Sequence, residues 1–125
     1  MKKKEIWNKD MEPERHEKGW GYELWIVNNN LYCGKILHFN KGKKCSWHYH
    51  KIKQETFYVQ KGKLKIWYGY DDDITKAQEL IMVPGQKFEV PAGLKHQILG
   101  LEDTDMFEFS TTHSESDSHR IIKGD

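Results

Sequence analysis

Several features are scarce or absent in this chain of 125 residues, and each excludes a class of protein. No apolar run approaches the roughly 20 residues that are needed to span a bilayer. The N-terminal stretch MKKKEIWNKD lacks the apolar core of a secretory signal. We therefore expect a cytoplasmic protein without a membrane partner. Neither sign of charge dominates, since 20 Lys and Arg are balanced by 19 Asp and Glu, so no nucleic-acid partner is expected.

The chain also has few cysteines and no sustained helical periodicity. The two cysteines, Cys33 and Cys45, do not form a CxxC pair, and two are too few for a disulfide framework. We interpret both as reduced residues that pack within strands. No segment keeps an apolar period of 3.6 residues over a useful length, which argues against a helical protein.

Aromatic residues and short apolar segments are abundant instead. The chain has five Trp, six Tyr, five Phe and ten Gly, a composition typical of β proteins. The charged residues 1–18 are predicted to form an N-terminal arm or an edge strand, and residues 19–125 one all-β domain, a sandwich or a barrel, with a jelly roll among the options. Turn residues separate about nine predicted strands: 22–27, 31–39, 44–50, 56–60, 63–70, 80–83, 87–90, 97–99 and 106–111.

The stretch SWHYHKIKQE at 46–55 contains the first candidate site. His48 and His50 are two residues apart and so share one face of a strand. Glu55 shares a face with Phe57 and Val59; if that face is buried, an unpartnered carboxylate there would be costly. A metal ion would remove this cost, because imidazole and carboxylate groups on adjacent strands can bind one ion. The alternative is that these residues decorate an exposed strand.

Two glycine-framed stretches carry a recognisable pattern. They are Gly42-x5-His48-x-His50-x4-Glu55-x6-Gly62 and Gly85-x5-Pro91-x-Gly93-x2-His96. These spacings resemble the two motifs of the cupin superfamily, although Gly100 stands where the second motif usually ends in Asn. The resemblance covers residues 20–112, with a motif core at 42–62 and 85–100. It implies a cupin-type jelly-roll β-barrel whose divalent metal (Mn, Zn, Fe, Ni or Co) is bound by His48, His50, Glu55 and His96.

Further stretches resemble the cupin domain of type II mannose-6-phosphate isomerases. Residues 18–23 (KGWGYE) are similar to that family's (R/K)PWGxYE segment, with Gly19 in place of Pro, and residues 115–120 are similar to its acidic tail. His48 stands where those enzymes usually carry Gln, and these 125 residues contain no nucleotidyltransferase domain. The D-lyxose isomerases, which are also cupin sugar isomerases, offer a comparable ligand set. The resemblance therefore implies a carbohydrate or sugar-phosphate substrate, but not one named sugar.

The chemistry implied is aldose–ketose isomerisation, which moves a proton between C1 and C2 through an enediolate. A divalent metal would stabilise the developing negative charge, and a base must reach the carbon-bound proton. Lys35 and Glu108 are the candidate catalytic residues, because each lies mid-strand where an apolar residue is expected. As a pair beside the metal they could shuttle the proton; the alternative is that both face solvent. Arg120 could bind a phosphate or carboxylate, or act as a surface ion-pair partner.

Two other functions fit the same residues. One is a non-catalytic cupin that binds or senses a carbohydrate, and the other is an Fe(II)-dependent dioxygenase, which three histidines and a glutamate serve equally well. The sequence also predicts an exposed apolar patch, which is formed by Trp47, Tyr49, Tyr58 and Trp67. Because a patch of this size is unfavourable on a monomer, we expect a homodimer that covers it.

Overall fold

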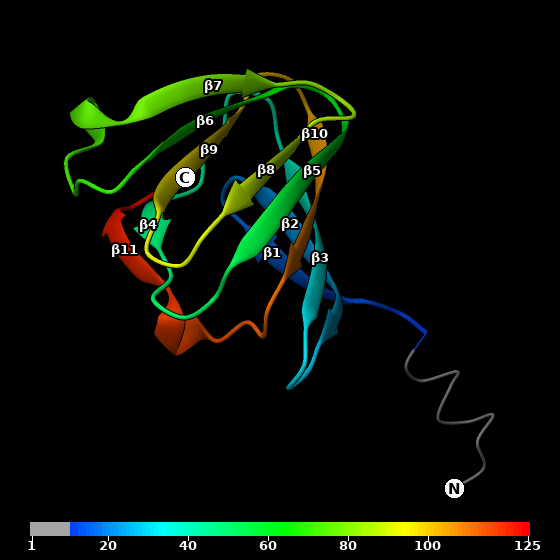
Figure 1. Cartoon of the computed structure of the whole chain (residues 1–125). Helices are drawn as coiled ribbons and strands as arrows, with labels where there is room; N and C mark the ends of the chain where they lie inside the picture. The colour runs from blue at the N-terminus through cyan, green and yellow to red at the C-terminus, as the bar shows by residue number, and fades with distance from the viewer. Residues whose placement is uncertain (1–10) are drawn as a thin grey trace, which may run out of the picture.

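Two antiparallel sheets face each other in the computed structural model, which describes residues 11–125 (Figure 1). The first ten residues, part of the predicted arm 1–18, lie outside the described residues. The six-stranded sheet has the order β1 (Glu14–Lys18), β2 (Gly21–Asn28), β3 (Cys33–Phe39), β10 (Thr104–Ser110), β5 (Glu55–Lys61) and β8 (Lys87–Val90). The five-stranded sheet has the order β11 (His119–Ile122), β4 (Trp47–Tyr49), β9 (Lys95–Gly100), β6 (Leu64–Gly69) and β7 (Gln78–Met82).

The all-β prediction is confirmed. Between residues 11 and 125, the helical segments are two short 3-10 turns, η1 (Ile74–Lys76) and η2 (Glu115–Asp117). None of the helical segments in this range is long and apolar enough to cross a membrane. Every predicted strand has a counterpart: 87–90 coincides with β8, and the other predicted strands have shifted ends. The sequence reasoning assigned no strand to β11, because HRII is short and follows a polar segment.

The apolar core lies between the two sheets and follows strand parity. In β6, Leu64 and Ile66 are fully buried, and Tyr68 packs partly buried against the same cluster. In β5, Phe57 and Val59 point inward, and Glu55 lies on the same buried face. In this way the pattern that builds the core also carries a carboxylate into the interior.

The turns that frame the motifs depend on glycine. Gly62, between β5 and β6, has φ of +93°, and a Cβ there would lie 2.3 Å from the carbonyl oxygen of Asp103. Gly93, between β8 and β9, has φ of +89°, and its N–H donates to the carbonyl of His50 over 2.7 Å. Because side chains disfavour this left-handed backbone, glycine at position 93 lets the turn before β9 reach the segment after β4.

The predicted exposed aromatic patch is wrong in one essential member. Trp47 is completely buried, because the loop that precedes η1 covers the outer side of β4 and the carbonyl of Asp72 accepts a 2.8 Å hydrogen bond from the indole Nε1. The other three residues are divided between the sheets: Tyr58 lies on β5, while Tyr49 and Trp67 belong to the five-stranded sheet. The expected patch is therefore not formed, and the homodimer stays a prediction.

Candidate metal centre and its pocket

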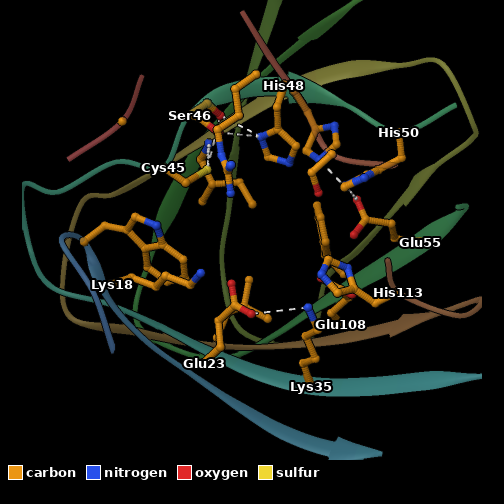
Figure 2. A pocket seen from close by; sticks show the side chains of 18 of the residues that line it. Lys18, Glu23, Lys35, Cys45, Ser46, His48, His50, Glu55, Glu108 and His113 are labelled. Carbon is orange, nitrogen blue, oxygen red and sulfur yellow. Dashed lines mark hydrogen bonds and ion pairs between the residues drawn. The ribbon is translucent and has the colours of Figure 1, made fainter. Parts of the chain in front are cut away.

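A cavity of about 440 Å³ opens between the two sheets and collects most of the buried polar residues. The five-stranded sheet and the segments beside it contribute histidines, and the six-stranded sheet contributes carboxylates and lysines (Figure 2). Apolar side chains from both sheets complete the lining, among them Trp20, Leu37, Phe39, Phe57 and Ile98. The volume falls in the range of small-molecule sites, roughly 300–1,000 Å³.

Three histidines meet at one end of this cavity. The strand register places His48 on β4 opposite His96 on β9, and His50 follows β4 directly. One ligand nitrogen from each of the three rings lies within 4.8 Å of the other two. The predicted metal ligands His48, His50 and His96 are therefore brought together.

Each of these rings has its Nδ1 directed at a main-chain carbonyl. The Nδ1 atoms of His48, His50 and His96 donate to the carbonyls of Ser46 (2.9 Å), Asp117 (3.0 Å) and Leu94 (3.0 Å), respectively. Donation at Nδ1 leaves Nε2 without a proton in the neutral ring, so its lone pair is free to bind a cation. The backbone thus orients all three rings as metal ligands.

The surroundings of His48 and His50 favour the neutral, metal-binding form. Burial lowers the pKa of His48 well below its ordinary value, and the neighbouring rings of His96 and His50 lower it further. Burial also lowers the pKa of His50 to about 4, although the charge of Glu55 acts in the opposite direction. At neutral pH both rings are therefore uncharged.

Glu55 brings a carboxylate to the same point. Its Oε2 lies 3.1 Å from the Nε2 of His96 and 3.7 Å from the Nε2 of His50. Both Glu55 Oε2 and His96 Nε2 are buried and make no hydrogen bond. Burial acts to raise the pKa of Glu55, but a positive charge at His96 and the ammonium of Lys53 hold it well below its usual range.

These orphaned atoms provide a test of whether the residues fit a metal. An oxygen and a ring nitrogen that both offer lone pairs at 3.1 Å repel each other unless a cation or a proton lies between them. Imidazole nitrogens with a carboxylate are a common ligand set for divalent transition metals. The histidine cluster could therefore bind a divalent metal ion, and Glu55 is placed to join it.

Lys53 is a buried charge that the sequence reasoning missed. Its side chain is only 2% exposed, and its ammonium lies 3.1 Å from Glu55 Oε1, 3.0 Å from Glu108 Oε2 and 3.0 Å from His113 Nδ1. An ammonium has three donors, so each has a partner. Lys53 therefore joins the metal end of the cavity to its acidic side.

The two candidate catalytic residues both face the cavity, but they pair with other residues. The register sets Lys35 opposite Glu108 on β3 and β10, and both are buried. The Lys35 ammonium, however, binds Glu23 Oε1 at 3.2 Å (Figure 2), whereas Glu108 accepts from Lys53. The expected contact between Lys35 and Glu108 is thus replaced by two separate ion pairs.

Glu108 and Glu23 are carboxyl groups that line the cavity, and their pKa values shift in opposite directions. Burial and the nearby charge of Glu55 raise the pKa of Glu108 to about 7, although Lys53 acts in the opposite direction. Glu23 behaves differently: burial would raise its pKa, but Lys35 and a hydrogen bond from Trp25 lower it overall. The pKa values of two carboxyl groups in one cavity are therefore shifted in opposite directions, as in many acid–base sites.

The C-terminal segment forms one wall of the cavity. Arg120 lines the pocket from β11, and its guanidinium is exposed and 3.9 Å from Glu115. His113 also lines the cavity, where burial lowers its pKa. Lys18 and Lys123 add two further cationic groups to the lining. Only Arg120 among these was predicted as a ligand-binding residue.

Comparison with protein families now identifies the architecture. A family model described as "Cupin domain" matches residues 35–111. The chain belongs to the cupin family. The predicted single-domain cupin fold is therefore confirmed. A search of curated protein sequences found no match to the chain.

Solved structures share this cupin fold at low sequence identity. CapF, a capsular polysaccharide assembling protein from Staphylococcus aureus, is 18% identical with a TM-score of 0.74, covering 86% of this chain and 34% of CapF. KdgF from Halomonas sp. is 14% identical with a TM-score of 0.70, covering 82% of this chain and 91% of KdgF. Oxalate decarboxylase from Bacillus subtilis is 18% identical with a TM-score of 0.74, and the match covers 88% of this chain and 30% of the decarboxylase. That enzyme has Mn(II) centres. The chain spans about a third of CapF and of oxalate decarboxylase.

Proposed function

We propose that this cupin is a metal-dependent isomerase of a sugar or sugar phosphate, with His48, His50, Glu55 and His96 as the metal ligands. One observation carries the proposal. A histidine cluster suited to a divalent ion and a buried acid–base group, Glu108, share a single small cavity. Proton transfer next to a metal-bound oxygen substrate requires this combination.

The charge of the cavity favours an anionic substrate. Lysine and arginine contribute five positive groups to its lining, and glutamate contributes four acidic groups. A divalent ion would add two more positive charges, so the loaded site would be cationic overall. Lys18, Arg120 and Lys123 carry the positive charge that is not enclosed in the buried ion pairs, which suits a phosphate or carboxylate on the substrate.

Each side chain has a definable task in such a reaction. A bound divalent ion would hold substrate oxygens and stabilise negative charge on them. Glu108 would accept or donate the proton that moves between neighbouring carbons. Lys35 uses one donor on Glu23, so its remaining donors are available for a substrate oxygen. The apolar lining would limit water around the reacting atoms.

The proposal is tested by metal analysis followed by a substrate screen. The protein would be purified, assayed for bound metal, and incubated with aldoses and ketoses, with and without phosphate, in ²H₂O. Because Mn(II) occupies the centres of oxalate decarboxylase on the same fold, Mn(II) is the first metal to add. Chelator-treated protein is the control. We expect metal-dependent isomerisation with deuterium incorporation at carbon; oxygen consumption that depends on Fe(II) would instead indicate a dioxygenase and contradict the proposal.

A second candidate is a carbohydrate-binding cupin without turnover. It is favoured by the contacts of Glu108, whose Oε2 already accepts hydrogen bonds from Lys53 and Ser110. A carboxylate oxygen engaged in this way is less available to take a proton from a substrate carbon. Saturable sugar or sugar-phosphate binding by calorimetry, with no isomerisation and no deuterium incorporation under any metal, would establish this alternative.

A further inference from the structure

The strand that carries the histidines is short and depends on its neighbours. β4 has three residues, and its register with β9 contains one residue pair, His48 with His96. On its other side β4 pairs with β11 through His119, Arg120 and Ile122, opposite Tyr49, His48 and Trp47, respectively. The C-terminal strand therefore supplies most of the ladder that fixes β4.

One buried acid fastens the segment that follows β4. The Asp117 carboxylate accepts hydrogen bonds from the backbone N–H groups of Lys51 (2.9 Å), Ile52 (3.2 Å) and Lys53 (2.9 Å). Three consecutive N–H groups on one carboxylate form a strong, charge-assisted cap. These hydrogen bonds lower the pKa of Asp117 although burial acts against them. The cap fixes the backbone from which the side chain of Lys53 enters the cavity.

The main chain of the same residue orients a metal ligand. The carbonyl of Asp117 accepts the Nδ1 proton of His50 at 3.0 Å. Removing a hydrogen-bond partner of a metal-binding histidine typically weakens metal affinity by about 10–100-fold. Asp117 therefore acts twice on the site, through its carbonyl on His50 and through its carboxylate on Lys53, which in turn contacts Glu55.

A second attachment holds the end of the chain against the segment that leads into β4. The N–H of Asp125 donates to the carbonyl of Lys44, and the N–H of Lys44 donates to Asp125 Oδ2, both at 2.9 Å. A Cβ on Gly124 would lie 2.3 Å from the carbonyl carbon of Cys45. The C-terminal segment is thus attached both before and after the strand that bears His48.

We propose that the C-terminal segment, residues 113–125, is a structural part of the metal centre, with Asp117 as the positioning residue that couples its docking to metal binding. Coupling is reciprocal. A docked segment raises metal affinity, and a bound metal in turn holds the segment in place. Because Arg120 and Lys123 lie on this segment, metal loading also sets the wall that would contact a substrate. The inference rests on the metal-binding part of the proposed function and not on isomerisation.

The test measures both directions of the coupling with Co²⁺ as the probe. Calorimetry gives the Co²⁺ dissociation constant of the wild type and of the D117A and D117N variants. The matched control is D103A, because Asp103 caps the N–H of Lys41 at 2.8 Å from an exposed loop away from the pocket. Hydrogen exchange of residues 113–122, with and without Co²⁺, reports the reverse effect in the wild-type protein.

D117A keeps the main-chain carbonyl that accepts from His50 and removes only the carboxylate that caps residues 51–53. We therefore expect D117A to weaken Co²⁺ binding about 10-fold, the lower end of the range for loss of an outer hydrogen-bond partner. D117N should lie between D117A and the wild type, and D103A should stay within about two-fold of the wild type. Saturating Co²⁺ should slow exchange of residues 113–122 in the wild type. If Co²⁺ binds but leaves that exchange unchanged, the inference is overturned, even where D117A fails to fold. Wild-type protein that does not bind Co²⁺ overturns the inference and the metal site together. Coupling without isomerisation would leave the inference standing and refute only the activity.

Discussion

The two sides of the cavity bury polar groups in different ways. On the histidine side, three imidazole rings are fixed by main-chain carbonyls, and two buried atoms, on Glu55 and His96, lack a hydrogen bond. On the acidic side, Lys35 pairs with Glu23, and Lys53 pairs with Glu108. The acidic side is neutralised by the protein's own side chains, whereas the histidine side could be completed by a cation. The difference supports the proposed division, with metal binding on one side and proton transfer on the other.

The largest expected effect comes from removing a ligand on the histidine side. H96A should reduce metal affinity by well over the roughly 100-fold that loss of an outer hydrogen-bond partner costs. Metal content after dialysis, measured by mass spectrometry, checks this expectation. H38A is the matched control, because His38 pairs with Asp105 on the outer side of the sheet. Retention of one tightly bound metal by H96A would refute His96 as a ligand.

Changing the acidic side should affect turnover and leave the metal in place. E108Q removes the proposed acid–base group while keeping its size, so we expect the turnover number to fall by about 10²–10⁴. Isomerase assays measure the turnover number, and metal analysis of the same sample measures whether the metal is retained. E89Q on the exposed face of β8 is the control. Loss of metal from E108Q would show that the two sides do not act separately.

A bound metal should also stabilise the fold, because it would satisfy the buried atoms of Glu55 and His96 that lack a hydrogen bond. At a free metal concentration 100 times the dissociation constant, the free energy of unfolding should rise by about 2.7 kcal/mol. Thermal melts in chelator and in Mn²⁺ measure the difference. No shift for wild-type protein that binds metal in calorimetry would mean that the unfolded chain binds the metal equally well.

The smallest effect concerns the ion pair between Glu23 and Lys35. Because the pKa of Glu23 is lowered overall, its contribution is present above its unfolded pKa and is lost as the pH falls through the folded value. The loss should be on the order of 1 kcal/mol, typical of one hydrogen-bonded pair. Denaturant unfolding between pH 6 and pH 3 measures it as a flatter acid limb in E23Q. An identical acid limb in E23Q and the wild type would count against this pair.

The sequence allowed much of the histidine side to be predicted, but less of the acidic side. The shared face of His48 and His50 follows from strand parity, and His96 was added because the glycine-framed spacings resemble the cupin motifs. The inward position of Glu55 follows from its alternation with Phe57 and Val59. Lys35 and Glu108 were found because charged residues in mid-strand are unusual. Their ion-pair partners, Glu23 and Lys53, were not predicted, because ion pairing depends on how far side chains reach across a sheet.

Lys53 and Asp117 could not be predicted from local pattern. Lys53 lies in a charged loop, where lysine is ordinarily solvated, and its partner Glu108 is 55 residues away. Asp117 lies in a polar segment that shows no periodicity. Both are buried only because strands distant in sequence converge on them, which no window of the sequence displays. The prediction of an exposed aromatic patch was wrong for the same reason, because the loop that contacts Trp47 comes from another part of the chain.

The pairing of β4 with β11 has a consequence for the order of events during biosynthesis. The histidines at 48, 50 and 96 emerge from the ribosome before Asp117 and the last strand. At roughly 5–20 residues per second, the 21 residues from 97 to 117 take about 1–4 seconds to synthesise. During that interval a nascent chain presents the ligands without the segment that fixes them. Under the proposed coupling, metal capture at full affinity would follow the docking of the C-terminal strand.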